Sequence, residues 1–142
     1  LKDSDIVGLS WGKTMYQTIK NITPSEPKKI QVVQVVGNST DNYNLDIDVT
    51  SLVQKMAKIY QGTAQFLYAP MYINSDIVRK ELLKESVIRR VIEIIRRSDY
   101  VVTGIADVST KKEYLGRLSD RRKNAGLGKK WCCRVSLRLF SG

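Results

Sequence analysis

Apolar residues follow two different spacings that alternate along the chain. Short, nearly continuous apolar runs predict strands, and between them apolar residues recur every three or four positions, as in a helix. The four predicted strands cover Asp5–Leu9, Ile30–Val36, Ala64–Ala69 and Tyr100–Ile105. The three predicted helices cover Thr14–Ile22, the stretch from Asp48 to Gly62, and Asp76–Ser98. The predicted order is therefore β-α-β-α-β-α-β.

Glycine and proline mark the boundaries between these stretches. Pro24 and Pro27 end the first helix because proline cannot continue its hydrogen-bond ladder, Gly62 supplies the stop of the second helix, and Pro70 ends the third strand. The run IQVVQVV at 30–36 is typical of a strand covered on both faces. The last helix carries an apolar stripe of Ile77, Leu82, Val87, Ile88, Val91, Ile92 and Ile95, and an outer face solvated by Arg89, Arg90, Arg96 and Arg97.

This alternation predicts an α/β fold, a Rossmann-like three-layer α/β/α arrangement around a mostly parallel sheet. In open sheets of this kind, ligands bind outside the carboxyl ends of the strands. Those ends are residues 10–14, 37–39, 70–72 and 104–107. We expect them to converge on one rim.

The segment DIVGLSWGKT at residues 5–14 has the layout of a phosphate-binding turn. A short apolar strand runs into Gly12, which permits a sharp turn, and a helix follows at once, so that its first amides are free to hold an anion. Gly8, Gly12, Lys13 and Thr14 read G-x-x-x-G-K-T, one residue shorter than the ATP-binding P-loop, so a nucleotide-hydrolysing site is not expected. A plain strand-to-helix turn that binds nothing is the alternative.

Composition limits the class of protein. The 142 residues, 42% of them hydrophobic, suffice for one domain with a buried core, and no apolar run is long enough to span a membrane. The start of the chain lacks a signal-peptide pattern. The two cysteines, Cys132 and Cys133, are adjacent and lack imidazole or further thiol partners, so neither a disulfide between them nor a metal site is expected. We therefore expect a soluble cytoplasmic protein without metal or cofactor.

The net charge of +10 is concentrated at the end of the chain. From Lys111 onward ten Lys or Arg stand against two acids, whereas residues 1–110 hold fourteen against twelve. An argument for nucleic-acid binding therefore depends on this final segment. Trp131 beside Lys129 and Lys130 is able to stack on a base, and an exposed, partly ordered end is the alternative.

Four stretches in unbroken order carry a resemblance to a known family: LSWGKTM, VVGN, FLYAP and ELLKESVIRRVIEIIRRSDYVVTGIADV. Together they resemble the sugar-binding effector domain of SorC/DeoR-type bacterial transcriptional regulators, which has a phosphosugar isomerase-like fold. The resemblance covers residues 1–118, which we expect to form part of such a domain. Residues 119–142 depart from the family pattern and form a separate basic segment.

The resemblance implies how the whole regulator works. In this family a separate N-terminal segment binds operator DNA, and the effector domain binds a phosphorylated sugar that alters oligomerisation or DNA affinity. Because the first predicted strand begins almost at the first residue, the DNA-binding part is expected to lie outside this chain, which looks like a middle piece of a regulator. The expected partners are a phosphorylated sugar and further copies of the protein, as a dimer or tetramer, and no membrane.

The resemblance also implies which residues bind the ligand. The phosphate loop of the family falls on Ser10, Trp11, Gly12, Lys13 and Thr14, and the rest of the rim on Gly37, Asn38, Asp48, Tyr72, Gly104 and Asp107. Two of these have an equally simple structural explanation. Asp48 stands where a helix N-cap is needed, and Trp11 ends a core strand and so serves packing equally well.

Two other classes of function stay open at this point. A sugar-phosphate isomerase or deaminase-like enzyme shares the fold, but the chain has no histidine, so proton transfer would fall on a lysine and on carboxylates such as Asp48 and Asp107. The third class is an oligomerisation module that binds no ligand. Response to a sugar phosphate separates the three: a sensor is stabilised, an enzyme consumes the sugar, and a module does neither.

Overall fold

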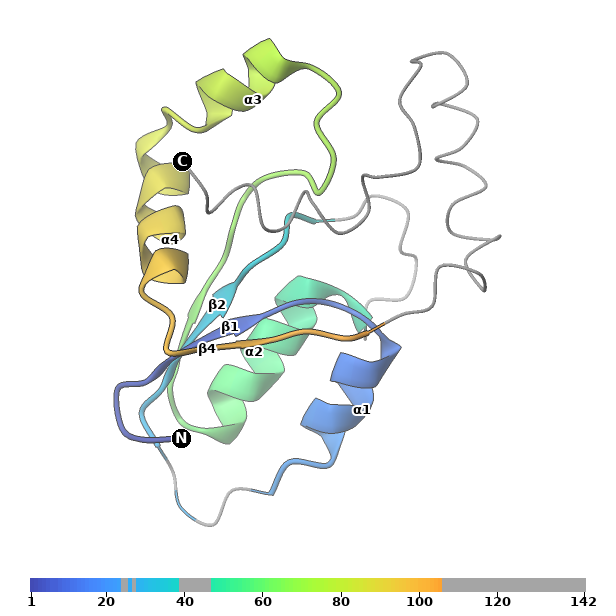
Figure 1. The fold of residues 1–142 in the computed structure, drawn as a ribbon. Coiled ribbons are helices and arrows are strands. Elements are labelled where there is room, and N and C mark those ends of the chain that lie inside the picture. Colours follow the sequence, from blue (N-terminus) through green and yellow to red (C-terminus); the bar gives the residue numbers. More distant parts are fainter. Residues whose placement is uncertain (24–25, 27, 39–46, 106–142) are drawn as a thin grey trace. The chain divides into compact units, whose positions relative to one another are not determined.

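A computed structural model describes residues 1–23, 26, 28–38 and 47–105 of the chain. The described elements are β1 (Ile6–Leu9), α1 (Lys13–Lys20), β2 (Gln31–Gln34), α2 (Val49–Ile59), β3 (Thr63–Gln65), α3 (Asp76–Leu82), α4 (Ser86–Arg96) and β4 (Tyr100–Val102) (Figure 1). The chain divides into two units, Leu1–Gly104 and Ile105–Gly142, and the fold below is that of the first. The predicted boundary between 1–118 and 119–142 lies outside the described residues.

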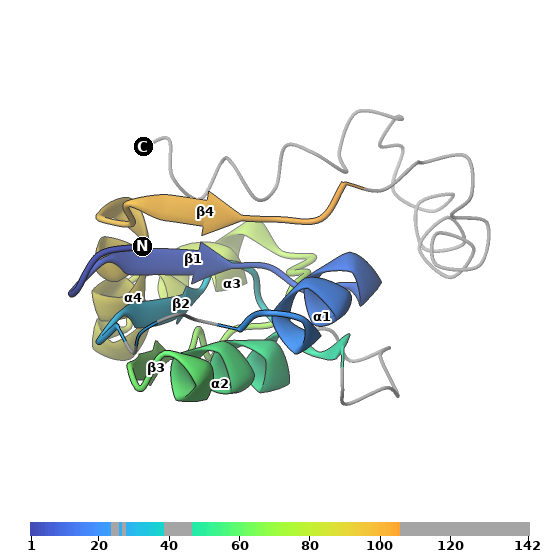
Figure 2. The ribbon, with the colours of Figure 1, turned by 90° about the horizontal axis from the view of Figure 1, so that it is seen from below.

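The four strands form one parallel sheet in the order β3-β2-β1-β4 (Figure 2). In register, Val7 of β1 lies beside Val32 of β2 and Tyr100 of β4. Each connection between neighbouring parallel strands passes through helical structure, as parallel pairing requires. The predicted α/β fold with alternating strands and helices is confirmed.

Helices cover both faces of the sheet. α1 and α2 pack on one face, where Val7, Leu9 and Val32 join buried side chains of both helices in one cluster. α4 contacts β1 and β2 from the other side (Figure 1). Because successive side chains of a strand point to opposite faces, β2 alternates between these two layers and is buried from Val32 to Gln34. The three-layer arrangement follows from this double coverage.

The single helix predicted over Asp76–Ser98 is wrong. The chain forms two helices, α3 and α4, because it turns at 83–85, where Glu85 adopts an extended backbone and precedes the first residue of α4. The predicted stripe is correspondingly split. Its later members, Ile88, Val91, Ile92 and Ile95, are buried under α4, whereas Ile77 and Val87 are 75% and 57% exposed. The four arginines of the outer face are exposed as predicted.

The strands are shorter than the apolar runs that predict them. β2 stops at Gln34, although the run continues to Val36, and β3 covers only Thr63–Gln65 of the run to Ala69. Beyond β3 the chain leaves the ladder and returns to it at one isolated bridge, between Asn38 and Pro70. Apolar character therefore reports burial in this part of the sheet, and hydrogen bonding ends earlier.

The end of α2 differs from the prediction in which residue turns the chain. Gln61, with φ of 52°, adopts the left-handed conformation, and Gly62 donates its N–H to the Ala57 carbonyl at 2.8 Å, as in a Schellman motif. Gly62 is required for another reason. A Cβ at this position would lie 1.9 Å from the carbonyl oxygen of Ile30, so no larger residue fits against the start of β2.

None of the helices in the described ranges is long and apolar enough to cross a membrane.

Candidate functional site

The turn from β1 into α1 leaves backbone N–H groups available at the predicted rim. Gly12 has φ of 132° and ψ of 164°, a region that essentially only glycine adopts. The first bond of the helix runs from Tyr16 N to Gly12 O, so the amides of Lys13, Thr14 and Met15 have no acceptor within the helix. No side chain caps this end of α1. Together with the positive end of the helix dipole, these amides form a site that favours an anion.

The space above this turn is open. A Cβ built at Gly12 meets no atom within 4 Å, so the glycine is required by its backbone conformation and not by crowding. Lys13 and Thr14 are both exposed, which leaves the ammonium group and the hydroxyl accessible from solvent. The acidic residues that would oppose an anion are absent from the first turn of α1.

The ends of β1 and β4 are joined directly. Ser10, which is buried, donates its hydroxyl to Thr103 Oγ1 at 3.0 Å and its N–H to the Val102 carbonyl at 3.2 Å. Gly104 lies next to α1, since a Cβ at this position would be 3.8 Å from Thr14 Cβ. Both donors of Ser10 are thus engaged within the protein, and the residue ties the loop to β4. Thr103 was not predicted, although it follows β4 as Ser10 follows β1.

The ends of β2 and β3 are joined in the same way. Asn38 donates its N–H to the Ala69 carbonyl and accepts from Met71 N, both at 2.9 Å. Gly37 allows this close approach, because a Cβ there would lie 2.5 Å from Pro70 backbone atoms. The predicted rim positions Gly37 and Asn38 are therefore held against the segment that follows β3.

Gln34 is a polar residue of this rim that the sequence reasoning missed. It ends β2 with 0% of its surface exposed and contacts Asn38 and the chain after β3. The available signal was a glutamine inside an otherwise apolar run, which the pattern IQVVQVV absorbs into a buried strand.

Asp48 caps α2. Its Oδ2 accepts from Thr50 N at 2.9 Å, and its backbone is extended, as expected of an N-cap residue. The structural explanation for this aspartate is thus observed, and its role toward a sugar hydroxyl stays a prediction.

Two substitutions separate the two roles of Asp48. Asp48→Ala is expected to lower the free energy of unfolding by about 1 kcal/mol, the usual effect of losing an N-cap. Asp48→Asn keeps a side-chain oxygen and so most of the stability. Urea denaturation measures both. A variant Asp48→Asn that is as stable as the wild type but binds a sugar phosphate more weakly would assign the carboxylate to the ligand, whereas unchanged binding would leave it with the cap alone.

Family comparison decides what this arrangement belongs to. The sequence profile described as "Putative sugar-binding domain" matches residues 1–127. The chain belongs to this family. The sugar-binding domain so defined is that of SorC/DeoR-family transcriptional regulators, as predicted from the four stretches.

Two curated relatives and one solved structure support the same family. The Deoxyribonucleoside regulator of Bacillus subtilis (strain 168) is 30% identical over 108 residues, which are 76% of this chain and 34% of that protein. The uncharacterized transcriptional regulator YjhU of Escherichia coli (strain K12) is 28% identical over 97 residues, 68% of this chain and 29% of that protein. The full-length sorbitol operon regulator SorC of Klebsiella pneumoniae superposes with a TM-score of 0.75 at 17% identity, over 87% of this chain and 43% of that one.

The sugar-binding domain therefore spans about a third of the length of the curated relatives it matches. Both relatives are named as regulators and neither as an enzyme.

The remaining predicted site residues of the sugar-binding domain differ in what the structure shows. Trp11 is partly buried and packs against the main hydrophobic cluster, so packing is its observed role. Tyr72 follows the segment that pairs with Asn38 and is 51% exposed. Asp107 lies outside the described residues. Within the part of the chain that is described, no group of three or more His, Cys, Asp or Glu could hold a metal ion.

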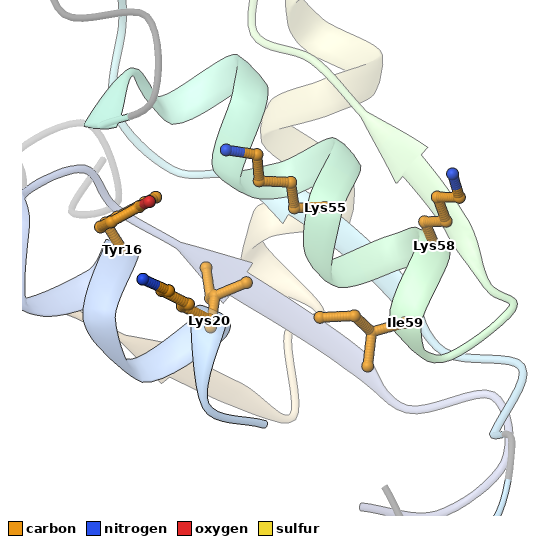
Figure 3. A pocket seen from close by; sticks show the side chains of 6 residues that line it. Tyr16, Lys20, Lys55, Lys58 and Ile59 are labelled. Carbon is orange, nitrogen blue, oxygen red and sulfur yellow. The ribbon is translucent and has the colours of Figure 1, made fainter. Parts of the chain in front are cut away.

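A groove of about 500 Å³ lies between α1 and α2, away from all of these residues (Figure 3). It is lined by Tyr16, Ile19, Lys20, Lys55, Lys58 and Ile59. The Lys55 ammonium stands 5.2 Å from the centre of the Tyr16 ring, within the range of a cation–π contact. Because the groove lies between the two helices and includes no predicted rim residue, we do not assign the sugar site to it.

Proposed function

We propose that this domain senses a phosphorylated sugar for a bacterial transcriptional regulator and that the loop at 10–14 binds the phosphate. The observation that carries the proposal is the start of α1. A glycine in a glycine-only conformation opens a helix whose first amides are uncapped, within a domain of a sugar-binding family. A phosphate oxygen is the chemistry that such amides bind best.

Two side chains add to the phosphate site. Thr14 Oγ1 is able to donate to a phosphate oxygen, and Lys13 adds a positive charge at an exposed position. Neither residue takes part in any of the ion pairs described, which join Lys28 to Glu26, Arg79 to Asp76 and Lys84 to Glu81. The sugar would extend from this loop toward the polar groups at the ends of β2 and β4.

The rest of the regulator enters the proposal through the relatives. They are transcriptional regulators that are longer than this chain, so we propose that operator DNA is bound by a separate part of the protein and that the domain works in the cytoplasm as a homo-oligomer. Ligand binding would then change DNA affinity by favouring one arrangement of the oligomer. The names of the relatives leave the sugar of this chain open.

An enzyme of the same fold is the second candidate, and the composition disfavours it. The chain contains no histidine, the side chain most often used for general acid–base catalysis near neutral pH. A sensor binds the sugar phosphate and returns it unchanged.

Phosphorus-31 NMR tests binding and turnover together. Added protein is expected to broaden or shift the resonance of one or more sugar phosphates without producing a new resonance over hours. Thr14→Val, which keeps the side-chain shape and removes the hydroxyl, is expected to weaken binding by about fivefold to tenfold, the effect of one hydrogen bond to a charged group. Thr63→Val, at the opposite end of the sheet, is the matched control and should bind as the wild type does.

Two results would contradict the proposal. Equal affinity of Thr14→Val and the wild type would remove Thr14 from the phosphate site. A new phosphorus resonance that grows with time would make the protein an enzyme.

A further inference from the structure

Gln34 has a fixed side-chain amide in the interior of the protein. The residue ends β2, an inner strand between β3 and β1, and none of its surface is exposed. Its Nε2 donates to the Val36 carbonyl at 2.8 Å and to Asn38 Oδ1 at 2.5 Å, and lies 3.4 Å from the Leu67 carbonyl. Because all three neighbours of the nitrogen are acceptors, only one orientation of the amide suits them.

The contact with Gln34 completes the fixing of Asn38. The backbone of Asn38 is already held on both sides by the strand-like bridge to residues 69–71. With Oδ1 turned toward Gln34, the remaining group of the Asn38 amide is the donor Nδ2, to which the described residues give no acceptor. Asn38 itself is exposed. The rim thus carries an oriented N–H donor that a ligand can reach.

The other atom of the Gln34 amide shows that this arrangement is not favoured by stability. Gln34 Oε1 is buried and has no hydrogen-bond partner among the described residues. A buried acceptor without a donor is destabilising, and an apolar residue of similar length would fill the same space without that penalty. The glutamine is therefore explained by what its nitrogen does, which is to hold Asn38 and the two carbonyl groups.

We propose that Gln34 is a positioning residue that presents Asn38 Nδ2 as a hydrogen-bond donor to an oxygen of the sugar. The proposal rests on the proposed function, in which the phosphate of the same ligand lies at 10–14. A donor fixed before the ligand arrives selects for a sugar oxygen at one place and loses little freedom on binding. Inorganic phosphate, which lacks the sugar, does not use it.

A double-mutant cycle on the full chain tests this. The variants are Gln34→Met, Asn38→Ala and the combination, and the probes are the sugar phosphate that the wild type binds and inorganic phosphate. Each single substitution is expected to weaken sugar phosphate binding by about fivefold, and the double variant to bind no more weakly than Asn38→Ala alone. Affinity for inorganic phosphate should stay unchanged. Gln31→Met, on the same strand at its amino end, is the control and should leave both affinities as in the wild type.

A second measurement needs no ligand. The side-chain amide of Asn38, observed by nitrogen-15 relaxation, is expected to be as ordered as the backbone in the wild type and to become as mobile as that of exposed Asn74 in Gln34→Met. An Asn38 amide equally ordered in both proteins would overturn the positioning role of Gln34.

The outcomes separate this inference from the function on which it rests. If the wild type binds a sugar phosphate and the two losses multiply, Gln34 does not act through Asn38 and the inference is overturned alone. If the wild type binds no sugar phosphate, the proposed function fails, and the ligand role of Asn38 fails with it.

Discussion

Gly62→Ala is expected to lower the free energy of unfolding by about 3 kcal/mol or more, because the added methyl group has no space. The Cβ would lie 1.9 Å from the Ile30 carbonyl oxygen, which already accepts the N–H of Thr63 at 2.9 Å. This oxygen belongs to the backbone that leads into β2, so relief of the clash requires β3 and the end of α2 to move away from the centre of the sheet. Thermal or urea denaturation measures the loss.

Gly104→Ala is the matched control for this prediction. Its Cβ would lie 3.8 Å from Thr14 Cβ, an ordinary contact distance, and we expect little change in stability. A protein that tolerates Gly62→Ala as well as Gly104→Ala would show that the packing of the α2 end against the start of β2 is wrong.

Gly12→Asp is expected to abolish sugar phosphate binding, a loss of about a hundredfold or more. Two effects add. A carboxylate at the start of α1 repels the phosphate at short range and occupies the space that the ligand needs. In addition, the φ of 132° at Gly12 is strained for any residue with a side chain, by about 1 to 3 kcal/mol. Titration with the sugar phosphate, followed by phosphorus-31 NMR, measures the affinity.

Gly12→Ala separates the two effects. It introduces the same backbone strain without charge, and its Cβ meets no atom within 4 Å. We expect it to lose part of the stability and of the affinity and to remain measurable. If Gly12→Ala and Gly12→Asp bind equally, the negative charge has no bearing on the ligand, and the phosphate does not lie at this turn.

The order and layers of the fold could be predicted from the sequence because two periodicities report them directly. Short apolar runs between amphipathic stretches leave few arrangements other than a parallel sheet with helices on both faces. The break at 83–85 could not be predicted in the same way. The spacing of Leu82, Val87 and Ile88 is compatible with one continuous helix, and only packing of α4 on the sheet decides that the chain turns there.

Contacts between distant residues account for most of what was missed at the site. The phosphate loop is a local feature of residues 10–14 and was visible as such. The bond from Ser10 to Thr103 joins residues 93 positions apart and depends on the register of β1 and β4. Gln34 was hidden for a related reason, since its value lies in what the chain at 36–38 and Leu67 bring to it.

Thermal unfolding of the full chain with and without a panel of phosphorylated sugars tests the central claim most directly. Each sugar phosphate is paired with its free sugar and with inorganic phosphate. We expect one cooperative transition that a sugar phosphate raises and its free sugar does not, with a stabilisation of about 2.7 kcal/mol at a hundredfold excess over the dissociation constant. A cooperative transition that no sugar phosphate moves would contradict the account and leave assembly as the function of the domain.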